Sequence, residues 1–477
     1  MNLTALLQQY TRWYHILYPT TDTIVVYNPS GQDPLARVPF LSNTNVDEAI
    51  TKASQSTWAK RSVEDRSSLL QQVGATILEK CEDLATIISL ENGKPLEQSR
   101  AEVRYASSFF TWFAEEIHKL QATDILSPHP HIRITKKYAP VGVCACITPW
   151  NFPLAMLAKK IAPALASGCS IVCKPSEITP LSALALGYIL QEKGIPANTV
   201  QFVLGNPSEI GKQFCSHPQI QKLSFTGSTT IGAILYAQSA QNLQKLSLEL
   251  GGNAPFIVFA SADIEKAIQG TLFTKFRNSG QACISSNRFI IEESIMTKFT
   301  VRLLEAITMV QVGDAFDPQS DIGPVINPQA KQKIFRLVQD AIDKGATLLY
   351  GSPTPPDDLF IYPIVLSNIT STMDCWKEEI FGPVITIAGC TSEEEAIHMA
   401  NDTKYGLGAY VYSEDTSQLE RCIDSIECGL LGINTGAISM AAAPFGGIKH
   451  SGFGKEGGSE GLLEYCTLKS IVTLIPS

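Results

Sequence analysis

The sequence predicts an α/β protein with two parallel-sheet units and a small additional β element. Between residues 141 and 240, short runs rich in β-branched residues alternate with helical stretches, which is typical of a parallel sheet. A second alternation of this kind begins near residue 255, and the tail LLEYCTLKSIVTLIP alternates like an edge strand. A chain of 477 residues is long enough to give each unit its own core.

The first 118 residues are predicted to be mainly helical after an irregular start. Ser62 to Lys80 has the pattern of an amphipathic helix, with Ser62 as its N-cap. A second helix is expected from about Glu82 to a stop at Gly93, and a third from about Glu97 to Leu120.

Four strand and helix pairs are expected in the first alternating region: VCACI with 153–167, SIVCK with 179–193, VQFVLG with 207–216 and KLSFTG with 229–240. Ligands of parallel sheets bind beyond the carboxyl ends of the strands, which here read ITPWN, CKPSE, VLGNP and FTGST. The apolar stretch 139–158 is long enough to cross a bilayer, but its three prolines exclude a single helix, so we expect no membrane partner.

The second alternating region contains PFIVF at 255, RFII at 288, ITIAG at 385 and NTGAI at 434. We therefore expect one unit from residues 1–118 and 139–250, and a second from 251–450. Residues 119–138 and 458–477 are expected to form a β element with an exposed edge. Such edges commonly pair with another chain, so this element is predicted to serve oligomerisation.

The composition argues against two classes of partner, nucleic acids and metal ions. The formal net charge is −9 and no basic cluster occurs, which argues against nucleic-acid binding. The twelve cysteines are scattered without CxxC or Cys/His ligand spacing, so we expect reduced thiols and no metal site. Because the N-terminus lacks the pattern of a secretory signal, a cytoplasmic location is expected.

Two local patterns suggest chemistry. Cys283 lies in RNSGQACISSNR, a small, polar, glycine-bearing stretch that suits a reactive thiol better than a packing residue. GSTTIG at 227–232 follows a strand and opens a helix, so its amides can bind phosphate, although it lacks the lysine of a P-loop. GFGKEG at 452–457 matches GxGxxG, but too little chain follows it to form a dinucleotide-binding unit.

Seven motifs in order resemble the aldehyde dehydrogenase superfamily over nearly the whole chain: ITPWNFP, CKPSE, SFTGSTTIG, LELGGNAP, GQAC, EEIFGPV and PFGGIKHSGFG. The resemblance implies a Rossmann-like cofactor domain, a catalytic domain, and a homodimer or homotetramer. It implies that Cys283 is the nucleophile, that Asn151 and the cysteine N–H hold the oxyanion, and that Glu249 is the general base. The presence of Glu249 also indicates hydrolysis of the acyl-enzyme rather than transfer to coenzyme A.

The resemblance also implies contacts to a nicotinamide dinucleotide. Lys174 and Glu177 would grip the adenosine ribose, and the carboxylate of Glu177 would repel the extra phosphate of NADP, so NAD is expected rather than NADP. The remaining cofactor-binding candidates are Trp150, Gly227, Ser228, Glu379 and Phe381. Core packing is the alternative role for Trp150 and Phe381.

Arg277, six residues before Cys283, and Ser439 in NTGAIS resemble the carboxylate-binding residues of succinate-semialdehyde dehydrogenases. Lys159 departs from that group, which usually has an arginine there, so the substrate could have another length. Ser285 replaces a cysteine of those relatives and excludes a disulfide with Cys283. The predicted substrate is succinate semialdehyde. The alternatives are glutarate semialdehyde, a broad range of aldehydes with Arg277 in a structural ion pair, or a non-catalytic binding protein on this fold.

Overall fold

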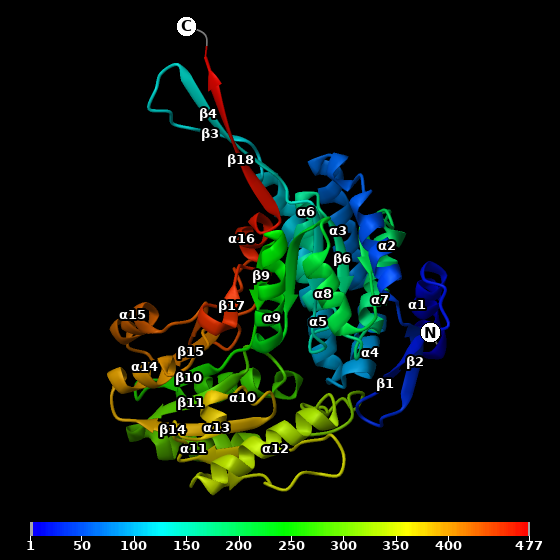
Figure 1. Ribbon diagram of the computed structural model, residues 1–477. Helices are drawn as coiled ribbons and strands as arrows, with labels where there is room; N and C mark the ends of the chain where they lie inside the picture. The colour runs from blue at the N-terminus through cyan, green and yellow to red at the C-terminus, as the bar shows by residue number, and fades with distance from the viewer. Residues whose placement is uncertain (1–2, 476–477) are drawn as a thin grey trace.

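A computed structural model describes residues 3–475 and has the predicted α/β architecture (Figure 1). Two separate sheets carry the two halves of the molecule, and a narrow antiparallel sheet projects away from them. The predicted fold class is therefore confirmed. Residues 1–2 and 476–477, the ends of the first and last predicted segments, lie outside the described residues.

The first sheet has six strands in the order β17-β9-β8-β5-β6-β7. All neighbours are parallel except β17, which runs antiparallel to β9. The strands are β5 (Val143–Ile147), β6 (Ser170–Lys174), β7 (Val200–Phe202), β8 (Ile220–Thr226), β9 (Lys245–Glu249) and β17 (Gly452–Phe453). The helices of this half are α1 (Leu3–Leu17), α2 (Asn43–Ser54), α3 (Val63–Glu79), α4 (Cys81–Asn92), α5 (Leu96–Glu116), α6 (Ala155–Ser167), α7 (Leu181–Glu192), α8 (Pro207–Ser216), α9 (Thr229–Ser239) and α16 (Gly458–Leu463).

The predicted start of α3 and the predicted end of α4 are confirmed. The Ser62 hydroxyl accepts a hydrogen bond from the Asp65 amide and caps α3, and Gly93 ends α4 in the left-handed region with φ 85°. The prediction of an irregular start is wrong, because α1 and the hairpin β1 (Thr23–Tyr27) and β2 (Pro34–Pro39) precede α2. The buried face of α1 combines Leu6 and Leu7 with the rings of Tyr10 and Tyr14 at helical spacing.

The second sheet has seven strands in the order β12-β13-β14-β11-β10-β15-β16, all parallel except β12. The strands are β10 (Ala254–Val258), β11 (Ser286–Glu292), β12 (Thr347–Tyr350), β13 (Ile364–Ser367), β14 (Val384–Cys390), β15 (Gly408–Tyr412) and β16 (Leu430–Ile433). The helices are α10 (Ile264–Phe276), α11 (Glu293–Ile307), α12 (Pro328–Asp343), α13 (Asp374–Lys377), α14 (Glu393–Asn401) and α15 (Thr416–Ser425). Apolar clusters fill both faces of this sheet.

NTGAI at 434–438 does not form the strand that its place in the alternation suggested. The strand is LLGI, and it ends where Asn434 adopts φ 52°, which a strand cannot continue. NTGAI is instead the loop that leaves the carboxyl end of β16, and this position brings Ser439 close to the nucleophile segment.

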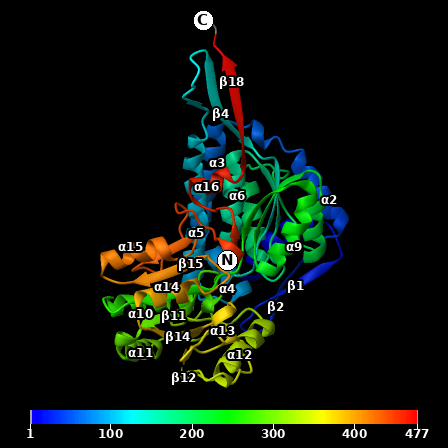
Figure 2. The same cartoon turned by 60° about the vertical axis from the view of Figure 1, so that its left-hand side comes forward.

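The third sheet, in the order β18-β4-β3, forms an arm that stands away from the two halves in both views (Figures 1 and 2). Its strands are β3 (Thr123–Ile125), β4 (Ile132–Pro140) and β18 (Cys466–Leu474). β18 pairs with β4 over its whole length, and beyond Cys466 every residue of β18 is exposed.

The apolar stretch 139–158 is divided between the end of β4, strand β5, a loop and the start of α6. Within residues 3–475, no helix has both the length and the apolar character needed to cross a membrane.

The chain passes from the first sheet to the second through Gly251 and Gly252, between the end of β9 at Glu249 and the start of β10 at Ala254. A Cβ atom on Gly252 would collide with the backbone carbonyl of Cys283. The absence of a side chain at Gly252 permits this close approach. It brings the end of β9 against the segment that carries the nucleophile candidate.

Candidate active site

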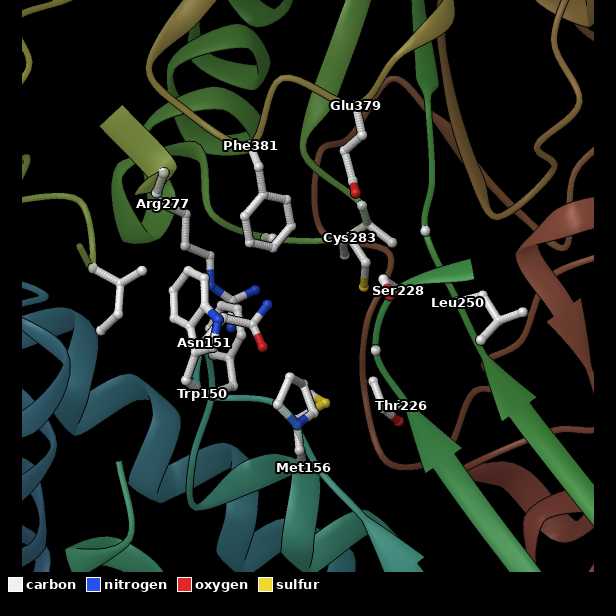
Figure 3. Close-up of a pocket in the computed structure, with 18 of the residues that line it drawn as sticks. Trp150, Asn151, Met156, Thr226, Ser228, Leu250, Arg277, Cys283, Glu379 and Phe381 are labelled. Atoms are coloured by element: carbon white, nitrogen blue, oxygen red, sulfur yellow. The ribbon is translucent and has the colours of Figure 1, made fainter. Parts of the chain in front are cut away.

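A cavity of about 350 Å³ lies between the two sheets, and ten of the thirteen predicted site residues line it. These ten are Trp150, Asn151, Lys159, Gly227, Ser228, Arg277, Cys283, Glu379, Phe381 and Ser439. In Figure 3 the sulfur of Cys283 points into the cavity, with Trp150 and Asn151 on one side and Ser228 on the other. The loops after β5, β8 and β9 therefore face the loops of the second sheet across the cavity.

The other three predicted residues lie off this cavity. Glu249 is the last residue of β9, and the next residue, Leu250, lines the cavity. Lys174, at the end of β6, donates a hydrogen bond to Glu177. Glu177 lines a neighbouring cavity of about 370 Å³ that shares Ile326 and Asn327 with the first.

The nucleophile segment leaves α10 through a short turn in an uncommon conformation. Asn278, Ser279 and Gly280 all have positive φ values of 50°, 58° and 76°. The Ser279 hydroxyl donates to the Gly323 carbonyl at 2.8 Å, and the Asn278 amide donates to the Asn151 carbonyl at 2.9 Å. These bonds hold a turn that directs Cys283 into the cavity.

The side chain and the backbone carbonyl of Asn151 are both held by residues that are far away in the sequence. Its side-chain amide donates to the Gln281 carbonyl at 3.1 Å, two residues before the nucleophile, which leaves its second N–H for another acceptor. Its backbone carbonyl accepts from Asn278 and, at 2.8 Å, from the buried ammonium of Lys94. No sequence pattern indicated these roles of Lys94, Asn278 and Gln281.

The surroundings of Cys283 favour the neutral thiol by raising its pKa. Burial raises its pKa to about 12, and the carboxyl groups of Glu249 and Glu379 act in the same direction. Lys159 acts in the opposite direction. Thiolate formation therefore depends on positive charge in the cavity.

The carboxyl group of Glu249 is buried, and neither oxygen has a hydrogen-bond partner among residues 3–475. Burial raises its pKa well above the ordinary value, and Glu456 adds to this effect, while Lys159 and Lys160 oppose it. A Cβ atom on Gly446 would lie 2.8 Å from Oε1, so this glycine makes room for the carboxyl group. A buried carboxyl group with a raised pKa beside a reactive cysteine suits a general base.

Glu456 is a functional candidate that the sequence reasoning missed. Lys159 Nζ lies 3.1 Å from its Oε2, and Lys160 Nζ binds its Oε1 and also donates to the Ser224 hydroxyl at 2.9 Å. Although burial alone would raise the pKa of Glu456, the two lysines lower it to about 2. Glu456 lies within GFGKEG, so that motif places a carboxyl group beside Lys159 and Lys160.

One wall of the cavity suits a dinucleotide. Ser228 caps α9 and, with Gly227, lines the cavity at the N-terminus of this helix, which is a favourable place for phosphate. Glu379 Oε1 accepts from the Gly252 amide at 3.3 Å, and burial raises the pKa of Glu379 to about 7. The rings of Trp150 and Phe381 meet edge to face at 5.7 Å on the cavity wall.

Arg277 supplies an uncommitted positive charge. Its guanidinium lies 4.7 Å from the Phe152 ring centroid, and no residue in the described part of the chain forms a hydrogen bond or ion pair with it. The alternative role in a structural ion pair therefore has no carboxylate partner within residues 3–475. Ser439 lies on the same wall, with its hydroxyl 2.6 Å from that of Tyr105. This end of the cavity suits a small anion.

Comparison with known proteins places this geometry in context. The sequence profile of the "Aldehyde dehydrogenase family" matches residues 17–471. A Saccharomyces cerevisiae protein named succinate-semialdehyde dehydrogenase, whose name specifies NADP(+), is 42% identical over 95% of this chain and 92% of its own length. A Pseudomonas putida glutarate-semialdehyde dehydrogenase is 39% identical over 94% of this chain and 93% of its own.

The crystal structure of a succinate-semialdehyde dehydrogenase from Burkholderia pseudomallei superposes with a TM-score of 0.94 at 41% identity, covering 95% of both chains. The sequence profile, the relatives and this fold agree with the cysteine, carboxyl and dinucleotide features of the cavity. The chain belongs to the aldehyde dehydrogenase family.

Proposed function

We propose that this enzyme oxidises a small aldehyde that bears a terminal carboxylate to the corresponding dicarboxylic acid. The proposed substrate is succinate semialdehyde. The observation that carries the substrate assignment is the unpaired guanidinium of Arg277 in the cavity that holds Cys283. The names of the yeast and Pseudomonas relatives support a semialdehyde substrate.

In the proposed reaction, Cys283 loses its thiol proton to solvent and its Sγ attacks the carbonyl carbon. A C–S bond forms as the C=O π bond breaks, which leaves the negative charge on the oxygen. The Asn151 amide and the Cys283 backbone N–H stabilise the oxyanion. Ser228, Glu379, Phe381, Lys174 and Glu177 would hold a nicotinamide dinucleotide, which would supply the acceptor for the hydride that leaves this carbon. Glu249 then deprotonates a water molecule, which attacks the thioester, and cleavage of the C–S bond releases the acid and restores Cys283.

The substrate assignment predicts the effect of Arg277→Ala. Wild type should use succinate and glutarate semialdehydes with higher kcat/KM than butanal. The variant should lose about 10- to 100-fold on the semialdehydes, because a charge-assisted contact contributes about 1.5–3 kcal/mol. Butanal, which has no carboxylate, should be used equally well by both proteins. Steady-state formation of reduced cofactor measures all three substrates.

Arg302→Ala is a matched control, because Arg302 is exposed and pairs with Glu265 outside the cavity. If wild type uses butanal as well as the semialdehydes and Arg277→Ala changes nothing, the enzyme is a broad-specificity aldehyde dehydrogenase. The ratio between succinate and glutarate semialdehydes decides between the two named substrates. Absence of turnover with every aldehyde would favour a non-catalytic binding protein.

The family uses NAD(P), and for this chain we propose NAD as the preferred form. Glu177 supports this proposal, because its carboxylate, paired with Lys174, would repel a ribose phosphate. Glu177→Ser should raise kcat/KM for NADP by about tenfold or more and lower that for NAD, since it removes a like charge and frees Lys174. Equal or higher efficiency of wild type with NADP would contradict the proposal. The name of the yeast relative, which specifies NADP(+), favours that outcome.

The assignment of roles to the three parts also belongs to this proposal. Residues 1–118 and 139–250 would bind the cofactor, 251–450 would carry the nucleophile, and 119–138 with 458–477 would join copies into a homodimer or homotetramer. The exposed residues of β18, including Leu468, Val472 and Leu474, support pairing of the arm with a second copy. All twelve cysteines are free, which supports the proposed cytoplasmic location.

A further inference from the structure

Lys159 lies on α6 in an enclosed position beside the reaction centre. Its side chain is 1% exposed, and its ammonium lies 3.1 Å from Glu456 Oε2. The same ammonium is 3.6 Å from the Phe445 ring centroid and 5.9 Å from that of Phe109. Lys159 nevertheless lines the cavity into which Cys283 points. Its charge is therefore held in a fixed place by neighbours on several elements.

The groups that face Lys159 are mostly acidic. They are Tyr105 from α5, Glu456 before α16, Glu249 at the end of β9 and Cys283 before β11. Cys283 in turn is faced by Lys159, Glu249 and Glu379. During turnover this small volume must hold a thiolate and a carboxylate in addition to the ionised Glu456. Such a concentration of negative charge requires buried cations.

Lys159 and Arg277, two cations that line the cavity, differ in whether they can bind a substrate carboxylate. A substrate carboxylate that reached Lys159 would lie close to Glu456 and near Glu249, and like charges would repel it. Arg277 has no such carboxylate neighbour and keeps its hydrogen-bond donors available. The geometry therefore separates the role of Lys159 from that of Arg277.

We propose that Lys159 is a positioning residue whose charge stabilises the ionised forms of Cys283 and Glu249, and that it does not bind the substrate carboxylate. The proposal rests on the proposed function, because it requires Cys283 to be the nucleophile. It replaces the substrate-binding role that the sequence suggested for Lys159. The direction of the pKa shifts agrees with this role. Lys159 lowers the pKa of Cys283 and that of Glu249. Burial acts to lower the pKa of Lys159 itself, but Tyr105 and Glu456 raise it.

Alkylation of Cys283 by iodoacetamide tests the proposal without turnover, because only the thiolate reacts at an appreciable rate. The rate for the Cys283 peptide is measured by mass spectrometry as a function of pH in wild type, Lys159→Met and Lys159→Arg. Methionine removes the charge at similar volume, and Lys160 still holds Glu456. Cys81, half-buried on α4 and without influence from Lys159, is an internal control in every sample.

At fixed pH below the pKa of the thiol, Lys159→Met should lower the alkylation rate of Cys283 by about tenfold or more, since a rise of one pKa unit reduces the thiolate tenfold. Lys159→Arg should stay near wild type, and Cys81 should be unchanged in all three proteins. An unchanged pH profile of Cys283 in Lys159→Met would overturn the proposal. If methionine unfolds the protein, Lys159→Gln is measured in its place and the same outcomes apply.

Turnover separates this proposal from a substrate-binding role and from failure of the proposed function. Lys159→Met should lower kcat/KM for butanal and succinate semialdehyde by the same factor, whereas a carboxylate ligand would affect only the semialdehyde. Loss confined to the semialdehyde would overturn the proposal. A wild type without semialdehyde preference would contradict the proposed substrate and leave the alkylation result valid.

Discussion

Cys283→Ala should abolish aldehyde oxidation, with kcat reduced by about four orders of magnitude or more for every aldehyde. Without Sγ no C–S bond forms, and the hydride then has no tetrahedral carbon from which to leave. Cys283 is also the one cysteine of the twelve that lines the cavity within the described residues. Formation of reduced cofactor under saturating substrate measures the loss directly.

The control for this variant shows that the site is otherwise intact. Cys283→Ala should bind NAD with wild-type affinity, seen as the same rise in unfolding temperature on adding the cofactor. Cys375→Ala, a change at a buried cysteine outside the cavity, should retain turnover. Substantial activity in Cys283→Ala would show that another group attacks the aldehyde.

Glu249→Gln should separate the two halves of the reaction. Glutamine keeps the shape of the side chain but cannot accept a proton, so hydrolysis of the thioester should slow by about 10²- to 10⁴-fold. Hydride transfer precedes this step and should persist. A rapid-mixing experiment should therefore show a burst of about one reduced cofactor per active site, followed by very slow turnover.

The pH dependence gives a second test of Glu249. Its pKa is raised, so the carboxyl group is neutral at low pH and becomes a base as the pH rises through that raised value. Wild-type deacylation should increase over this range, above the ordinary range of glutamate, and the glutamine variant should lack this increase. Glu97→Gln, on the exposed face of α5, is the matched control and should behave as wild type. Unimpaired turnover without a burst in Glu249→Gln would contradict the role of this residue.

The β/α alternation identified most of the two sheets because parallel strands are short, apolar and bounded by turn residues. It failed where local pattern and tertiary structure differ. The tyrosines of α1 obscured an amphipathic helix that packs against α7, where Tyr10 meets Tyr188 at 5.5 Å. NTGAI looked like a strand because of its position, although the strand had already ended at Ile433.

The candidate site was predictable where a short motif carries the chemistry, as around Cys283 and Glu249. Residues that support the site lie far from these motifs in the sequence. Lys94 binds the Asn151 carbonyl across 57 residues, and Lys160 binds Glu456 across 296. Such contacts depend on the packing of α4, α6 and the C-terminal segment, which no local pattern reports. The proposed role of Lys159 likewise depends on the fold, since only the fold places Glu456 beside it.

Gly252 lies where the two sheets meet at the candidate active site. The base candidate Glu249 ends a strand of one sheet, the nucleophile candidate Cys283 precedes a strand of the other, and the passage of Gly252 against the Cys283 carbonyl sets their separation. Two fragments divided in the connection between β10 and α10, for example after Ala260, would each hold one partner of the pair. Recovery of activity on mixing them would report reassembly, so the enzyme offers a split reporter whose signal requires correct docking of both halves.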